Sequence, residues 1–106
     1  MARRAMRQGT QNVLMDLGLP DAEELTAKAI LAKKINDILE ERRLTQSAAA
    51  ALLGIPQPKI SAIRHYKIRG ISLERLMQAL TALGQNVEIV VTPSRKRSAA
   101  RIAVAA

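Results

Sequence analysis

Hydrogen-bonding and cationic side chains gather between residues 55 and 70. The stretch includes the amide of Gln57, the hydroxyl of Ser61 and four cations, Lys59, Arg64, Lys67 and Arg69, and it contains no acid. Amide and hydroxyl groups pair with base edges or phosphates, and clustered cations attract a polyanion. These residues therefore predict a nucleic-acid surface. The alternative, a charge excess that only aids solubility, fits the chain ends better than this compact cluster.

The basic charge of the chain is unevenly distributed. Its 106 residues carry a net charge of +8, and both ends are basic, through Arg3, Arg4 and Arg7 and through Arg95, Lys96, Arg97 and Arg101. We expect a flexible basic arm over residues 1–12, a folded domain over 13–93 and a disordered basic tail over 94–106. The arginines of the arm are candidates for insertion into a DNA minor groove.

The chain has little material for catalysis. It has no Cys, a single histidine at position 65 and no glycine-rich phosphate loop. We therefore expect no enzyme activity, no cofactor and no metal site, because a metal needs more ligands than one His. His65 is either a phosphate contact or a surface residue beside a helix end. No apolar run approaches the ~20 residues of a membrane span. No apolar stretch follows the N-terminal arginines as in a secretory signal, and the lack of Cys fits a reducing cytoplasm.

Helical periodicity predicts the first long element. Apolar residues recur at three- and four-residue steps over residues 22–43, with Asp21 as the expected N-cap and Arg42 and Arg43 at the negative end of the helix. Lys28 is expected to fall outside the apolar stripe. The side chains expected to face the core from this helix are Leu25, Ala29, Ala32, Ile35, Ile38 and Leu39.

Two short helices are expected next, joined by a tight turn. Thr45 caps a helix over 46–53, Gly54 ends it, and a second helix runs from Pro56 to about residue 65, since prolines fit a first turn. Held at a steep angle, such a pair presents its second helix to the major groove of DNA. An ordinary helical hairpin would explain the apolar residues but not the acid-free outer face. The expected inward residues are Ala49, Leu52, Leu53, Ile55, Ile60 and Ile63, and the outward ones are Gln57, Lys59, Ser61, Ala62 and Arg64.

The last elements are a fourth helix and a short strand. Ser72 caps the helix, Gly84 ends it, and one face holds Leu73, Leu76, Met77, Leu80 and Leu83. The β-branched run over residues 87–91 predicts a strand that stops at Pro93. A lone strand needs a partner, so it either packs on its own helices or pairs with a second copy. The strand residues Val87, Ile89, Val90 and Val91 are therefore candidates for dimerisation.

The motif around the two short helices resembles a known family. Leu44-Thr45-Gln46-x-x-Ala49-x-x-Leu52-Leu53-Gly54-Ile55-x-Gln57-x-x-Ile60-Ser61-x-Ile63 is similar to the helix-turn-helix of Cro/C1-type (Xre) regulators. A wider stretch, from Asn12-Val13 to the run ending at Val91, resembles the HigA-type antitoxin branch. The resemblance implies an all-α, lambda-repressor-like bundle of four to five helices, with a motif over residues 45–64 and a C-terminal β-strand that pairs in a dimer.

The resemblance also implies roles for individual residues. Gln46 would contact a phosphate and Gln57 would pair with base edges. The chain departs from the family at Pro56 and Pro58, where the family often has a polar residue, so we expect fewer hydrogen bonds to bases there and apolar contact with a thymine methyl instead. Ala62 would reach little except a methyl, and Ser61 would reach a base or a phosphate. The remaining cations of the cluster, Lys59, Arg64, Lys67 and Arg69, would contact phosphates, with a solvated surface cation as the alternative for each.

The expected partners derive from the same resemblance. They are double-stranded DNA with a palindromic operator, a second copy of the chain and a small RNA-cleaving toxin. A toxin would face the acidic part of the first helix, at Asp37, Glu40 and Glu41, or the stretch over residues 13–20. The function implied is a repressor that binds its own operator and neutralises that toxin. A solitary regulator without a toxin, and a toxin-binding module with little DNA binding, stay open as alternatives.

Overall fold

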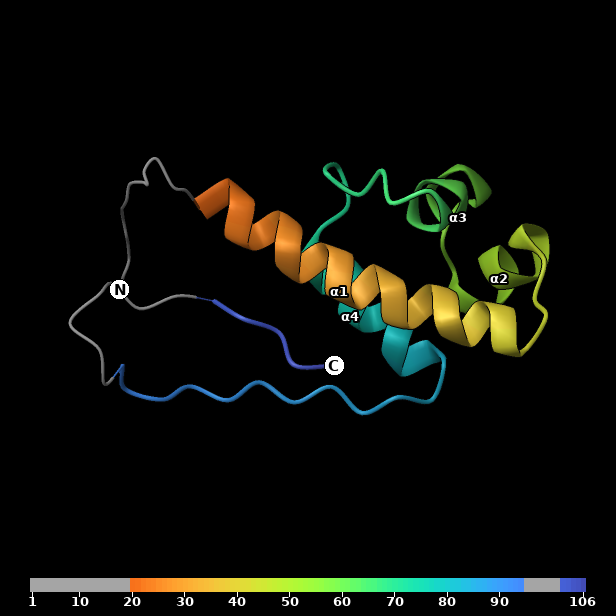
Figure 1. Cartoon of the computed structure of the whole chain (residues 1–106). Helices are drawn as coiled ribbons and strands as arrows, with labels where there is room; N and C mark the ends of the chain where they lie inside the picture. The colour runs from red at the N-terminus through yellow and green to blue at the C-terminus, as the bar shows by residue number, and fades with distance from the viewer. Residues whose placement is uncertain (1–19, 95–101) are drawn as a thin grey trace.

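Four helices form the folded part of the protein. The computed structural model describes residues 20–94 and 102–106, and it contains α1 (Pro20–Glu41), α2 (Gln46–Leu53), α3 (Gln57–Arg64) and α4 (Leu73–Ala82). Figure 1 shows α1 as the long central helix, with α4 beside it and the pair α2 and α3 near its C-terminal half. The expectation of an all-helical fold with four helices is thus confirmed for the described residues.

One apolar cluster joins all four helices. Its largest fully buried side chains are Ile35, Leu39, Ile60, Ile63, Leu76 and Leu83. Helix α1 packs mainly on α4, and α2 packs mainly on α3. Because the cluster draws on every helix, α2 and α3 are fixed against a common base. None of the helices in the described ranges is long and apolar enough to cross a membrane.

Three predicted orientations on α1 and α2 are wrong. Ala29 is exposed on α1, whereas Lys28 is only 4% exposed. The apolar stripe of α1 follows steps through positions 25, 28, 32, 35 and 39, which places Lys28 on the buried side. Leu52 is 48% exposed because α3 packs against α2 on the side of Ala49. The other residues expected to face the core are buried or half-buried.

The ends of α1 differ from the prediction. The helix begins at Pro20, so Asp21 lies in its first turn and does not precede it. At the other end, Arg43 adopts a left-handed conformation with φ of 55°. The Arg43 N–H donates to the Glu40 carbonyl at 3.0 Å and the Leu44 N–H donates to the Leu39 carbonyl at 2.9 Å, the pattern of a Schellman motif. The Arg42 side chain donates to the Leu83 carbonyl at 2.8 Å, so it serves the end of α4 and not that of α1.

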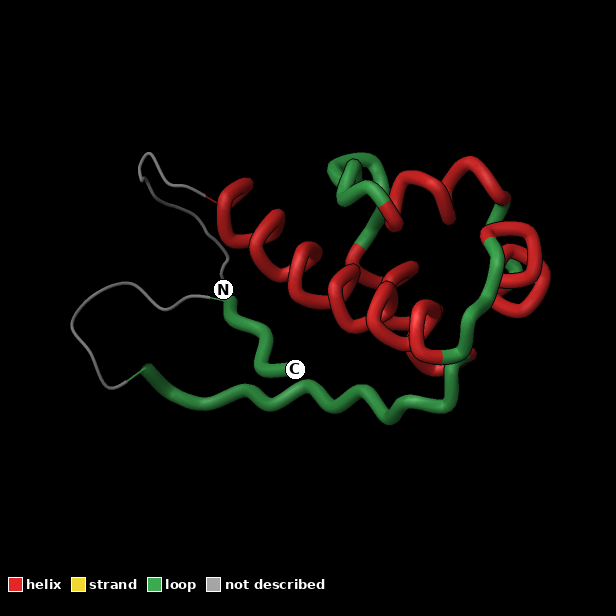
Figure 2. Tube along the Cα trace, turned by 45° about the vertical axis from the view of Figure 1, so that its right-hand side comes forward, coloured by secondary structure: helices red, strands yellow, loops and turns green. Residues whose placement is uncertain are grey.

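Residues 85–94, which follow α4, are extended without secondary structure. Within the described residues no strand is formed, so the predicted strand over 87–91 has no pairing partner among them. Figures 1 and 2 both show this segment running back toward the N-terminal end of α1. Val87 packs partly on the core, but Ile89, Val90 and Val91 are 76%, 76% and 90% exposed.

The described end of the chain lies beside α1. We expected residues 94–106 to form a disordered tail, and residues 95–101 lie outside the described residues. In residues 102–106, the Ile102 N–H donates to Glu23 Oε1 at 3.2 Å and Val104 packs against the core. The arm over 1–12 and the stretch over 13–19 also lie outside the described residues.

Candidate nucleic-acid interface

The turn between α2 and α3 is built from local capping. The Thr45 hydroxyl accepts the Ala48 N–H at 3.0 Å, which confirms Thr45 as the N-cap of α2. Gly54 ends α2 with φ of 66°, a conformation that favours glycine, and its N–H donates to the Ala50 carbonyl at 3.0 Å. Pro56 is the N-cap of α3, and Pro58 occupies its first turn, where a missing N–H costs no hydrogen bond. The turn therefore holds the two helices at a defined angle.

A shallow depression lies on the outer surface of this helix pair. Gln46, the first residue of α2, lines it together with Gln57, Pro58 and Ser61 of α3. Gln46 and Gln57 were singled out from sequence for phosphate and base contacts, and they lie eleven residues apart in the chain. The fold brings these two residues to one shallow depression. Pro58, which we expected to restrict hydrogen-bonded base reading but did not list as a contact, also lines it.

The surroundings of this depression are positively charged. Residues 42–73 contain no acid, and their cations are Arg42, Arg43, Lys59, Arg64, Lys67 and Arg69. Lys59, Lys67 and Arg69 are exposed, and so are Pro56 and Gln57. No carboxylate within this stretch of sequence offsets the positive charge of these cations.

Lys28 fixes the loop that carries two of these cations. Its Nζ donates to the Arg69 carbonyl at 3.0 Å and pairs with Glu24 Oε2 at 3.0 Å. A buried ammonium requires such partners because burial removes its hydration. The contact ties the loop over residues 67–70 to α1 through the Arg69 backbone. The side chains of Lys67 and Arg69 do not take part in it and are exposed.

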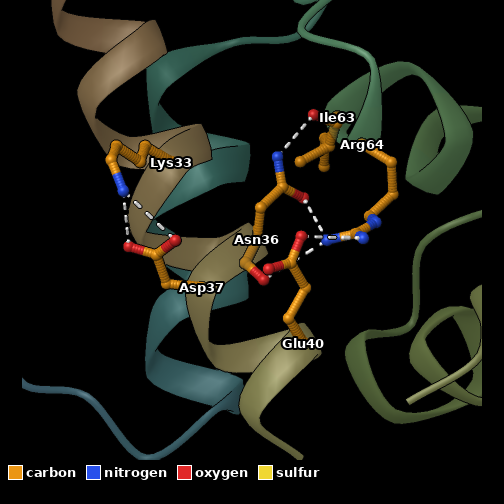
Figure 3. Close-up of polar contacts among 6 residues, drawn as sticks. All are labelled: Lys33, Asn36, Asp37, Glu40, Ile63 and Arg64. Atoms are coloured by element: carbon orange, nitrogen blue, oxygen red, sulfur yellow. Dashed lines mark hydrogen bonds and ion pairs between the residues drawn. The ribbon is translucent and has the colours of Figure 1, made fainter. Parts of the chain in front are cut away.

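Arg64 does not point freely outward as predicted. Its Nη1 donates to the backbone and side-chain oxygens of Asn36, both at 3.3 Å, and its Nη2 pairs with Glu40 Oε2 at 3.2 Å (Figure 3). The guanidinium is thus held by α1, because α3 crosses α1 at this point.

Two other predicted residues also have structural partners. Ala62 is half-buried and packs against the core, so it does not lie on the outer face as expected. The imidazole Nδ1 of His65 lies 2.8 Å from the Ser61 carbonyl, which places His65 at the C-terminal end of α3 as a surface residue. Among the described residues, no group of three or more His, Cys, Asp and Glu could hold a metal ion.

Sequence reasoning missed the polar residues of α1 that contact the motif. Asn36 is 4% exposed and lies next to Ile35 on the buried side of α1. Lys28 and Asn36 both interrupt an apolar stripe, and this interruption was the available signal. A polar residue on a core-facing stripe indicates a buried hydrogen-bond partner on another element.

A short helix pair with a capped turn, an acid-free outer face and exposed cations defines a helix-turn-helix DNA-binding protein. The comparisons with known proteins agree. A family model described as a helix-turn-helix domain matches residues 13–92. A solved structure described as an XRE family transcriptional regulator is 56% identical, with 82% of this chain and 99% of that chain covered and a TM-score of 0.75. A comparison with curated proteins gives no match. The chain belongs to the XRE family of helix-turn-helix transcriptional regulators, and it binds DNA.

Proposed function

We propose that the chain is a sequence-specific repressor that reads its operator through the first turn of α3. The observation that carries this proposal is the shared depression lined by Gln46, Gln57, Pro58 and Ser61, on a helix pair whose residues 46–64 include no acid. Gln57 is exposed at the start of α3, where a recognition helix meets base edges. A side-chain amide pairs bidentately with adenine. Pro56 is also exposed at this end of α3, and we expect it to pack against a thymine methyl.

The phosphate contacts in this proposal come from Gln46, Lys59, Lys67 and Arg69. Each of the three cations is exposed, and Lys28 holds the loop that carries two of them. Such contacts position the protein on the duplex and make its affinity depend on salt. We leave Arg64 out of this set because its guanidinium is bonded to α1. We also leave out Ala62, which packs against the core.

The base contact is tested by Gln57→Ala, with Gln78→Ala as the matched control. Gln78 is an exposed glutamine on α4, outside the acid-free stretch. Loss of one bidentate pair costs roughly 1–3 kcal/mol of discrimination. We expect Gln57→Ala to weaken binding to a duplex selected by the wild type from a random library, and to leave binding to a scrambled duplex unchanged. An equal loss on both duplexes would remove Gln57 from base reading.

We further propose that two copies pair through residues 87–91. Three consecutive β-branched residues, Ile89, Val90 and Val91, are largely exposed in an extended segment. An apolar extended edge is a ready template for another strand. A two-fold dimer would place two α3 helices one DNA turn apart, or ~34 Å, on a palindrome.

Two truncations test the dimer. A chain ending at residue 86 lacks the pairing segment, whereas a chain ending at residue 94 keeps it and lacks only residues 95–106. We expect the first to sediment as a monomer and the second, like the full chain, as a dimer. Dimers of both truncated chains would contradict pairing through this segment.

The finer role we propose is that of an autorepressing antitoxin, supported by the resemblance to the HigA-type branch outside the motif. Two of the three acids suggested for a toxin contact already form ion pairs within the chain. Asp37 pairs with Lys33 at 2.9 Å, and this hydrogen bond and the charge of Asp37 raise the pKa of Lys33. Glu40 pairs with Arg64. Of the three acids, Glu41 is therefore the strongest candidate in the described part of α1.

A genomic observation and a rescue assay test this role. A small toxin-like reading frame beside the gene, whose product arrests growth unless this chain is co-expressed, would support the antitoxin. A gene with no such neighbour would favour the solitary regulator.

A further inference from the structure

Asn36 makes a buried contact between α1 and the last turn of α3. It is 4% exposed, and its Nδ2 donates to the Ile63 carbonyl at 3.0 Å. Its Oδ1 accepts from Arg64 Nη1 at 3.3 Å. A carbonyl acceptor on one side and a guanidinium donor on the other define the orientation of the amide (Figure 3). One side chain of α1 thus contacts two successive residues of the recognition helix.

This contact is not needed to satisfy the Ile63 carbonyl. That oxygen already accepts the Tyr66 N–H at 3.1 Å within the end of α3. A buried amide is costly unless it is hydrogen-bonded, and a leucine of similar size would fill the same space without that cost. The amide adds a directional contact between α1 and α3, which apolar packing does not supply.

Arg64 and Glu40 extend the contact toward the surface. Arg64 Nη1 also donates to the Asn36 backbone oxygen at 3.3 Å, and Nη2 pairs with Glu40 Oε2 at 3.2 Å. The Arg64 side chain is 28% exposed and the Glu40 side chain 65%, so water reaches the ion pair mainly from the Glu40 side. We call Asn36, Glu40 and Arg64 the α1–α3 clamp.

We propose that Asn36 is a positioning residue for DNA reading, which sets the orientation of α3 on α1 through the α1–α3 clamp. The inference rests on the proposed base contact by Gln57 at the other end of α3. Seven residues of helix separate Gln57 from Arg64, or about 10 Å. A tilt of about 10° at the clamp would therefore move Gln57 by about 2 Å, which exceeds the tolerance of a well-formed contact.

The first test is Asn36→Leu in the full chain. The probes are a duplex selected from a random library by the wild type and a scrambled duplex of the same length. We expect the ratio of the two affinities to fall by about tenfold or more, the size of one lost base contact. Affinity for the scrambled duplex and its salt dependence should stay within about twofold, because the exposed cations are unchanged. A folded variant with the wild-type ratio would overturn the proposal.

The second test substitutes exposed residues of α1, so it does not depend on whether the buried-site variant Asn36→Leu folds. Glu40→Gln and Asp37→Asn each remove one negative charge and one ion pair from α1, but only Glu40 is bonded to α3. Because each substitution removes one negative charge from α1, the two should change the long-range electrostatic attraction to DNA equally. We expect Glu40→Gln to lower the specificity ratio several-fold and Asp37→Asn to leave it unchanged. If the Glu40→Gln and Asp37→Asn variants have equal specificity ratios, the proposal is wrong. This conclusion holds even if Asn36→Leu fails to fold.

The wild type separates this inference from the proposed function. A wild-type chain that binds all duplexes equally would refute base reading by α3, and the clamp would then have nothing to position. A wild-type chain with a clear specificity ratio that neither Asn36→Leu nor Glu40→Gln lowers would refute the clamp alone.

Discussion

Arg43 closes α1 in a conformation that glycine adopts at lower cost. Its φ is 55°, its side chain is exposed, and the two hydrogen bonds of the Schellman motif are made by backbone groups that any residue possesses. A left-handed conformation costs a residue with a Cβ roughly 1–2 kcal/mol. Glycine avoids this cost but loses roughly 0.4–1 kcal/mol through the greater freedom of its unfolded chain. We therefore expect Arg43→Gly to raise the free energy of unfolding by about 0.5–1 kcal/mol.

The assay is urea and thermal unfolding followed by circular dichroism, at one protein concentration because dimerisation adds to apparent stability. The expected gain raises Tm by roughly 2–8 °C for a folded unit of this size. Arg43→Ala is the control, since it removes the same charge and exposed side chain but keeps the Cβ. An Arg43→Gly chain no more stable than Arg43→Ala would refute the reasoning from backbone conformation.

Three further predictions concern the motif. Gly54→Ala should destabilise the chain by about 0.5–1 kcal/mol, since the left-handed φ costs a residue with a Cβ more than the stiffer unfolded chain gains, and a Cβ there would meet no atom within 4 Å; unfolding in urea measures this, and an unchanged midpoint would contradict it. Thr45→Ala should cost about 1 kcal/mol by removing the cap of α2, whereas Thr45→Ser should retain most of the stability, and equal losses would argue against the cap. Lys59→Ala should lower the salt slope of DNA affinity by about 1, while Lys34→Ala, at an exposed site on α1, should not; matching slopes would remove Lys59 from the phosphate contacts.

The helical architecture was predictable because its signals are local. Thr45 and Ser72 cap helices as expected, and Gly54 and Gly84 occupy the left-handed positions after α2 and α4. The ends of α1 and α3 were harder to place, because Arg43 and Tyr66 adopt the same conformation without being glycine. Arginine and tyrosine are not residue types that predict a positive φ. The Schellman hydrogen bonds and the packing of the neighbouring helices hold them there.

The outer face of α3 was only partly predictable. Periodicity placed Ile60 and Ile63 inward and left Gln57 and Lys59 exposed, and the structure agrees. Arg64 was expected to be free because no acid lies near it in the sequence. Its partners, Asn36 and Glu40, lie more than twenty residues earlier on α1. Only the crossing of α1 and α3 brings them together.

Short-range features of the sequence were enough to specify the helix-turn-helix, since capping, glycine placement and apolar spacing act over a few residues. The sequence also sets the absence of acids between residues 42 and 73, which makes this face a surface for a polyanion. Packing between distant segments decides which cations bind other parts of the chain and which stay exposed to solvent. It holds Arg64 on α1, buries Lys28 under the loop of Lys67 and Arg69, and joins Gln46 to Gln57 at one depression. These outcomes depend on how α1 crosses the motif, and contacts between residues distant in the chain are set by close packing, which no local pattern encodes.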